Sequence, residues 1–201
     1  RAEVAEATGL EPGAILVCAT QTHSAPSLGN FMLDPDFPMA TTPQTEYLRG
    51  AESAYGDVAA DAAVTAAIQA AESLRPVRIG MGRAIVGDLA FNRRGVRRDG
   101  SILMPKPQGR DQQPLGITDL CYLEGPIDPE VGVLCAGGLD DDQLVALLLH
   151  HTCHPVNTFG HRETYHSVSA DWPGAWAASL GAAGGEAEPV VLNGCCGNIN
   201  P

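Results

Sequence analysis

Lysine is almost absent from this sequence, and a basic surface is absent with it. The 201 residues carry 12 lysine and arginine side chains, of which one is lysine, against 24 aspartate and glutamate side chains. The formal net charge is −12 at pH 7. A protein that binds duplex nucleic acid needs a basic surface to displace counterions, and simple docking on anionic membranes needs one too. Both kinds of partner are therefore disfavoured, while the chemistry of a substrate pocket is unaffected.

Long apolar runs and dense cysteine are also missing. The longest strongly apolar run, residues 144–149, is far shorter than the roughly 20 residues of a membrane-spanning helix, and no signal peptide is visible. Six cysteines are too few to suggest a disulfide scaffold. Cys195 and Cys196 are adjacent, which is a poor geometry for a bond between them. We expect no membrane span and free thiols, with Cys18, Cys121, Cys135 and Cys153 acting as small core residues.

Composition and length indicate a globular protein, and the order of the predicted elements indicates the α/β class. Hydrophobic residues make up 44% of the chain and charged residues 18%, as in folded domains. The order of predicted strands and helices favours mixed β-sheets layered with helices. We expect helices at residues 2–7, 44–73 and 172–180, strands at 14–19, 77–86, 131–135, 144–152 and 189–192, a hairpin turn at 137–142 and a loop at 95–118.

Histidine is concentrated in one short stretch. Five of the six histidines lie between residues 150 and 166, and neutral imidazole is a common zinc ligand. A helix would give His150 and His154 the spacing of zinc proteases, but His151 stands where their glutamate belongs. In a strand His150 and His154 share one face, and Pro155 ends the strand. We therefore take His154 as the candidate ligand and give ordinary roles to His150, His151, His161 and His166.

Short polar sequences follow four of the predicted strands. Ligands of open α/β sheets usually bind at the carboxyl ends of the strands, so strands that lie side by side would bring these sequences into one pocket. Imidazoles, a guanidinium, amides and the Asp171 carboxylate would line it, and this set suits metal-assisted hydrolysis. The four sequences are QTHS at residues 21–24, FNR at 91–93, CHP at 153–155 and GNINP at 197–201.

Five motifs follow one another in a fixed order along the chain. They are ATQTHSAP at residues 19–26, NRR at 92–94, TCHP at 152–155, SADWPG at 169–174 and NGCCGNINP at 193–201. In this order they resemble the N-terminal catalytic domain of the neutral/alkaline non-lysosomal ceramidases and their bacterial relatives. These are zinc amidohydrolases that cleave the N-acyl bond of ceramide. The resemblance spans nearly all of the chain and implies the same α/β fold.

The resemblance implies a Zn²⁺ cofactor and a role for individual residues. His154 matches the family's zinc-binding histidine after the long strand, and Arg93 matches the arginine that contacts the reacting group of the substrate. His23 matches the histidine that assists catalysis beside the metal, and it is also a candidate ligand here. Asp171 and Asn200, in the last two motifs, complete the implied catalytic set.

Three departures from the family pattern bear on the site. Gln21 replaces a histidine that binds zinc in the ceramidases proper, so zinc affinity should fall unless His23 takes over. Asn200 replaces a serine, as in the wider bacterial branch, which argues against a serine-dependent mechanism. The family's remaining ligands, a glutamate and a tyrosine, are expected downstream of Pro201.

The leading hypothesis is a zinc-dependent amidohydrolase of the bacterial ceramidase-like branch. It would hydrolyse the N-acyl amide of ceramide or of a related lipid amide with a metal-activated water. We expect residues 1–201 to form a single catalytic domain that is truncated at both ends. Export is common in the family, which implies a secreted or periplasmic location; the oligomeric state has no signal in the sequence.

Three alternatives stay open. Gln21 favours a degenerate, non-catalytic binding domain on the same fold. Hydrolysis of a non-lipid amide, an ester or a lactone would keep the chemistry and change the substrate. A third alternative is a metal site with soft ligands, in which three thiolates join His154; the thiolates are Cys153, Cys195 and Cys196.

Overall fold

The computed structural model describes residues 1–28, 42–45, 50, 52–103, 120–140, 143–182 and 186–201. By its internal contacts the chain divides into two compact units. The first comprises Arg1–Val17 and Ala25–Arg75, and the second comprises Cys18–Ser24 and Pro76–Pro201. All candidate site residues belong to the second unit. That the whole chain is one domain stays a prediction.

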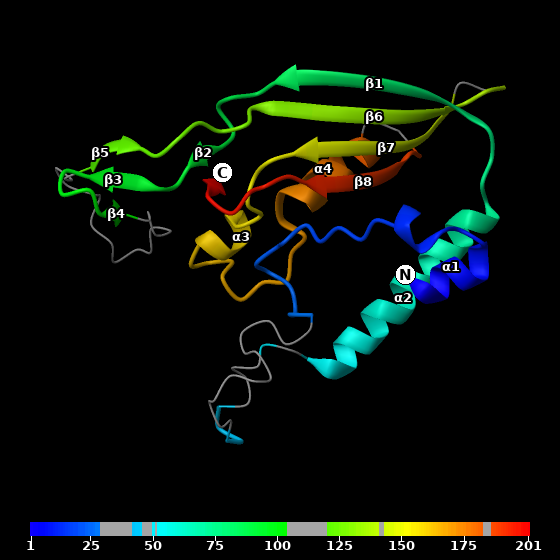
Figure 1. Ribbon diagram of the computed structural model, residues 1–201, viewed down its shortest axis with the longest axis horizontal. Coiled ribbons are helices and arrows are strands. Elements are labelled where there is room, and N and C mark those ends of the chain that lie inside the picture. Colours follow the sequence, from blue (N-terminus) through cyan, green and yellow to red (C-terminus); the bar gives the residue numbers. More distant parts are fainter. Residues whose placement is uncertain (29–41, 46–49, 51, 104–119, 141–142, 183–185) are drawn as a thin grey trace. The chain divides into compact units, whose positions relative to one another are not determined.

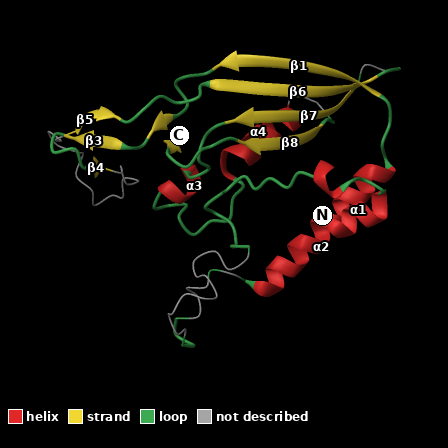
Figure 2. Cartoon of the chain, viewed as in Figure 1, coloured by secondary structure: helices red, strands yellow, loops and turns green. Residues whose placement is uncertain are grey.

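The first unit is helical. Its elements are α1 (Ala2–Thr8), the 3₁₀ helix η1 (Pro12–Ala14) and α2 (Ser53–Glu72), drawn as helices in Figure 2. The predicted end of α1 is confirmed, because Gly9 adopts φ 74, the left-handed conformation that closes a helix. The predicted helix at 44–73 begins later, at Ser53. Residues 42–45 form a turn, residues 50 and 52 have no regular structure, and residues 46–49 and 51 lie outside the described residues.

The strand predicted at residues 14–19 is wrong. Residues 15–20 form no regular structure, and Leu16 and Val17 are 73% and 70% exposed. A run of β-forming residues becomes a strand only when a neighbouring strand pairs with it. No strand in the described part of the chain does so.

A four-stranded mixed sheet forms the body of the second unit (Figure 1). Its order is β1-β6-β7-β8, with the first three strands antiparallel and β7 parallel to β8. The predicted hairpin between residues 131 and 152 is confirmed as the β6–β7 pair. The strands are β1 (Val77–Ile85), β6 (Glu130–Gly138), β7 (Leu144–His151) and β8 (Glu188–Asn193).

Helix α4 (Asp171–Ala182) joins the parallel strands β7 and β8 and contacts β8. It follows the short helix α3 (Asn157–Gly160). The expected helix after Asp171 is therefore confirmed, and so is the α/β class with a mixed sheet. None of the helices in the described ranges has the length and apolar character needed to cross a bilayer.

The second unit also contains two small sheets besides the four-stranded sheet. Strand β2 (Phe91–Asn92) pairs with β9 (Ile199–Asn200), which brings two of the predicted polar sequences together. A three-stranded sheet of order β4-β3-β5 contains β3 (Gly95–Arg97), β4 (Ile102–Leu103) and β5 (Leu120–Leu123). The loop predicted at 95–118 is thus partly wrong, and residues 104–119 lie outside the described part.

The most deeply buried part of this unit surrounds the polar strand ends. Cys153, Cys196 and Ile199 are at most 5% exposed, and Pro155 is fully buried. The six cysteines are free thiols as expected. Cys18 and Cys121 are exposed, however, so their predicted core role is wrong. Apolar packing therefore concentrates where four buried polar residues also lie: His151, Thr152, His154 and Asp171.

Candidate functional site

His154 is buried and has a fixed orientation at the end of β7. It is 3% exposed, and its backbone N–H donates to the carbonyl of Ile199 at 2.9 Å. Its Nδ1 lies 2.8 Å from the carbonyl oxygen of Cys196. A carbonyl can only accept, so the proton of the neutral ring is on Nδ1 and the lone pair is on Nε2. The neutral ring is thus held in the tautomer that can bind a metal through Nε2.

His23 faces this lone pair. The two Nε2 atoms are 3.1 Å apart, and the ring centroids are 5.0 Å apart at an interplanar angle of 69°. The segment that carries His23 is tied to the rest of the second unit by two hydrogen bonds. The His23 amide donates to the Pro155 carbonyl (3.2 Å), and the Thr22 hydroxyl donates to the Ser169 carbonyl (2.9 Å). The fold therefore pairs two imidazoles that are 131 residues apart.

Both imidazoles are biased toward the neutral form. Burial lowers the pKa of His23, the neighbouring His154 and Arg93 lower it further, and the charge of Asp171 opposes them. Burial also lowers the pKa of His154, and Arg93 adds to this, while the hydrogen bond to Cys196 opposes it. At neutral pH both rings are therefore neutral, and in the contact between them His23 Nε2–H donates to the lone pair of His154 Nε2.

Arg93 lies beside the pair and is anchored to the last strand. Its backbone N–H donates to the Asn198 carbonyl at 2.8 Å, and its Nη2 donates to the Gly197 carbonyl at 2.7 Å. Its Nε is buried and has no hydrogen-bond partner. The guanidinium lowers the pKa of both histidines, which places its positive charge within reach of the same centre.

Asp171 has both carboxylate oxygens engaged in local structure. Oδ2 accepts from the Thr158 amide at 2.7 Å and Oδ1 from the Trp172 amide at 2.8 Å, while Asn157 donates a longer bond at 3.5 Å. Asp171 also adopts φ 58, an uncommon value for a residue other than glycine. Its link to the histidines is through charge, because it raises the pKa of His23.

Asn200 lies in β9, opposite Phe91 of β2. Its Oδ1 is buried and has no hydrogen-bond partner. An unpaired buried oxygen costs free energy unless a ligand or water supplies a donor. This acceptor is the feature of Asn200 that suits a binding role.

The spacing of the two imidazoles is compatible with two ligand positions of a tetrahedral zinc site. Two imidazole nitrogens on one tetrahedral zinc are about 3.3 Å apart, close to the 3.1 Å between His23 and His154. Gln21 does not add a ligand, because its Oε1 accepts from the Cys196 thiol at 3.2 Å. Within the described ranges no group of three or more His, Cys, Asp or Glu side chains is placed to hold a metal ion. A thiolate-rich site with Cys153, Cys195 and Cys196 therefore has no support there.

Sequence patterns missed three residues that shape the site. Phe159 lies with its ring centroid 5.5 Å from that of His23. Trp172 donates from its indole N–H to the Cys153 carbonyl at 3.1 Å and packs against His151 at 5.5 Å. The third is Cys196, through its carbonyl. Cys196 and Trp172 stand inside recognised motifs, whereas no local signal points to Phe159.

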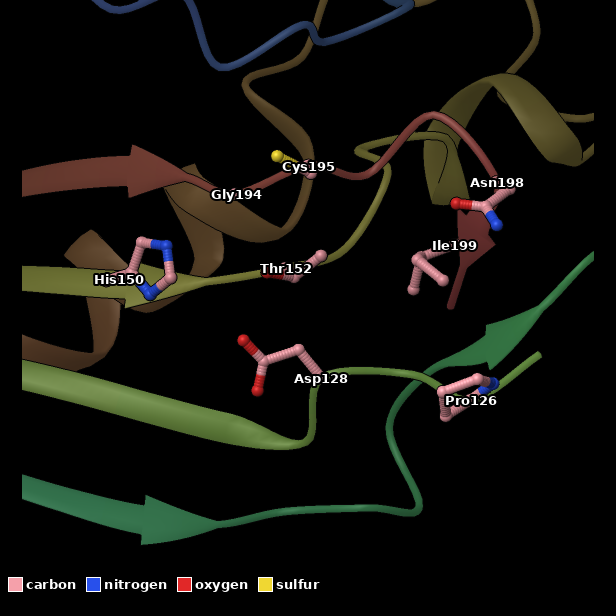
Figure 3. A pocket seen from close by; sticks show the side chains of 8 residues that line it. All are labelled: Pro126, Asp128, His150, Thr152, Gly194, Cys195, Asn198 and Ile199. Atoms are coloured by element: carbon pink, nitrogen blue, oxygen red, sulfur yellow. The ribbon is translucent and has the colours of Figure 1, made fainter.

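A pocket of about 300 Å³ lies next to this site (Figure 3). His150 and Thr152 both line it, in agreement with the predicted common face of these two residues, whereas His154 is not among its lining residues. The strand ends at His151, and alternation of side chains does not continue beyond it. The pocket is lined by Pro126, Asp128, His150, Thr152, Gly194, Cys195, Asn198 and Ile199.

Comparison with solved structures finds matches that cover nearly all of this chain, and two of them are ceramidases. The crystal structure of neutral ceramidase from Pseudomonas aeruginosa matches 99% of this chain with a TM-score of 0.62 at 17% sequence identity. The chain has a ceramidase-like fold. A ceramidase complexed with C2 matches 100% of the chain with the same TM-score and identity. The chain spans 28% of the length of each of these two structures.

The other comparisons give no relatives. No protein-family model matches the chain, and no curated protein matches it in sequence. The predicted resemblance to the ceramidases is therefore confirmed at the level of the fold.

Proposed function

We propose that this chain is part of a zinc-dependent amidohydrolase that cleaves the N-acyl amide bond of ceramide or of a related lipid amide. One observation carries the proposal: two imidazoles face each other with their Nε2 atoms 3.1 Å apart, and the Nδ1 of the buried one is held by a backbone carbonyl. A metal-binding histidine almost always has its second ring nitrogen hydrogen-bonded in this way. The ceramidase-like fold agrees with the proposal.

In this proposal His154 would hold the zinc ion, with His23 as the candidate second ligand, and the ion would supply a Lewis acid for the amide carbonyl and an acidified water. Where His154 holds zinc without His23, the neutral imidazole of His23 would accept and return the proton; an Nε2 that binds zinc has no lone pair left for this step. Arg93 stabilises the negative charge that develops on the carbonyl oxygen. Asn200 offers its unpaired oxygen to a substrate donor, and Asp171 favours the protonated form of His23.

The decisive experiment measures zinc content and hydrolysis of N-acylsphingosine by the full-length protein. We expect bound zinc and a loss of activity of at least about 100-fold in His154→Ala, the loss typical of a disrupted metal site. His161→Ala, which changes an exposed histidine, is the matched control and should keep both properties. A protein without zinc under non-chelating conditions contradicts the mechanism.

A second candidate is a non-catalytic binding domain on the same fold. It is favoured by Gln21, whose side-chain oxygen is occupied by the Cys196 thiol instead of facing the two histidines. Full function of the His154→Ala variant would support this candidate. Hydrolysis of a non-lipid amide, ester or lactone is distinguished by acyl-chain dependence, because a lipid amidase needs a long apolar acyl group. Export to the periplasm or the medium belongs to the same proposal and is tested by fractionating cells.

A further inference from the structure

Gln21 is fixed in place although its side chain stands at the surface. Its φ of 65 lies in the left-handed region, which is uncommon for a residue other than glycine. Its Oε1 accepts a hydrogen bond from the thiol of Cys196, which is 175 residues away in the chain. Uncommon backbone conformations persist where surrounding contacts determine them, and they concentrate at functional sites. The Gln21–Cys196 contact is therefore a candidate support for a neighbouring functional residue.

The Cys196 thiol is the centre of a small hydrogen-bonded network. Its S–H donates to Gln21 Oε1 at 3.2 Å, and its sulfur accepts from Asn193 Nδ2 at 3.3 Å. Asn193 Nδ2 also donates to the Thr20 carbonyl at 2.8 Å. Cys196 is 5% exposed. The network thus joins the segment before His23 to the loop after β8 through one buried side chain.

The backbone of the same cysteine orients His154. The Cys196 carbonyl accepts the Nδ1 proton of His154 at 2.8 Å. This bond places the lone pair on Nε2, which faces Nε2 of His23. The residue whose side chain is held by Gln21 and Asn193 is therefore the residue whose carbonyl selects the tautomer of His154.

We propose that Gln21 is a positioning residue for His154 and acts through Cys196. By accepting from the thiol it keeps the Cys196 carbonyl aligned with His154 Nδ1, so that the Nε2 lone pair stays directed at His23. Gln21 stands where the ceramidases have a zinc-binding histidine, so that ligand is missing here. In its place, Gln21 helps to orient another candidate ligand, His154. The consequence for zinc binding rests on the function proposed above, whereas the effect on the tautomer of His154 does not.

The test follows the His154 tautomer by ¹⁵N NMR of the ring nitrogens in the metal-free protein. Gln21→Asn shortens the side chain while keeping an amide that tolerates the left-handed backbone, and Cys196→Ala removes the thiol. In both we expect a mixture of the two neutral tautomers and zinc affinity about 10-fold weaker, as for loss of an outer-shell partner. Gln21→Glu and Cys196→Ser keep an acceptor and a donor, respectively, and should retain the Nδ1–H tautomer.

Cys195→Ala is the matched control, since Cys195 is the exposed neighbour of Cys196. It should leave the tautomer and the zinc affinity unchanged. If His154 stays in the Nδ1–H tautomer in both Gln21→Asn and Cys196→Ala, the positioning role is overturned. Circular dichroism shows whether the Cys196→Ala protein folds. If it does not, the tautomer of His154 in Gln21→Asn decides the test, because Gln21 is exposed and its substitution should not prevent folding. A tautomer change in a protein that never binds zinc would sustain this inference and overturn the proposed function.

Discussion

At the scale of single residues, burial favours the neutral form of three of the histidines. Burial is the largest cause of the lowered pKa of His23, His151 and His154. For the facing pair, neutrality leaves the lone pair of His154 Nε2 free to accept the N–H of His23 Nε2. The neutral form of His151 contributes no lone pair to this centre. Its Nδ1 is buried without a hydrogen-bond partner, and its ring packs on Trp172. We therefore expect the lowered pKa of His151 to affect the stability of the protein but not the chemistry of the candidate site.

We expect stability to fall as the pH falls below 6.5, and His151 to contribute to the fall. Its folded pKa is lower than its unfolded value, so the unfolded state binds more protons between the two values. Its contribution is fully present above pH 6.5 and is lost as the pH decreases toward the folded pKa, with a slope of at most about 1.4 kcal/mol per pH unit. His151→Phe keeps an aromatic ring against Trp172 and should flatten this dependence.

Urea unfolding at several pH values between 5 and 8 measures this slope. His161→Gln is the control, because it changes a histidine that is exposed. An unchanged pH dependence in His151→Phe would show that other groups cause the acid sensitivity.

At the scale of secondary structure, the parallel pair β7–β8 places the site. Its register sets His151 opposite Asn193, so both strands end at the same level. Thr152 and Gly194 follow directly and approach so closely that a methyl group on Gly194 would overlap the Thr152 hydroxyl. That methyl would also come within 3.2 Å of His150 Nε2. Glycine is thus required here by the closeness of two strand ends and not by an unusual φ.

Gly194→Ala should destabilise the protein by about 1–3 kcal/mol, the usual cost of overpacking a buried site. Gly197→Ala is the matched control in the same loop, because nothing lies within 4 Å of a methyl group there. Thermal and urea unfolding of both variants provide the comparison. Equal stability of the two variants would mean that β7 and β8 separate without cost.

At the scale of the whole molecule, the candidate site depends on a short segment from the N-terminal part of the sequence. Residues Cys18–Ser24 belong to the second unit although their neighbours on both sides belong to the first. The Thr22 hydroxyl donates to the Ser169 carbonyl, and the Ser169 amide donates to the Ser24 carbonyl at 2.7 Å. His23 therefore reaches His154 only when contacts across about 150 residues have formed.

Thr22→Val should lower the free energy of unfolding by about 1 kcal/mol, the usual net value of one such hydrogen bond. It should also speed hydrogen exchange at the Ser169 amide, whose partner lies on the same segment. Thr8→Val removes a hydroxyl bond of 2.6 Å to the Val4 carbonyl, only four residues away, and serves as the local control. If Ser169 exchange is unaffected, the segment is held by its backbone contacts alone.

The sequence by itself determined the elements whose signals are local. Apolar runs and alternation located β1, β6, β7 and β8, and Gly9 and Asp171 marked a helix end and a helix start. These features depend on residues close together in the chain. The α/β class and the ceramidase-like fold followed from their order and from the motifs.

Only the tertiary structure decided which side chains meet. It left residues 15–20 without a strand partner, and it directed His150 to a pocket that excludes His154. It also paired His23 with His154 and placed the Cys196 carbonyl where its hydrogen bond fixes the proton of His154 on Nδ1. Pairing and burial join residues far apart in the chain, so they exist only once the fold has formed, and no local pattern encodes them.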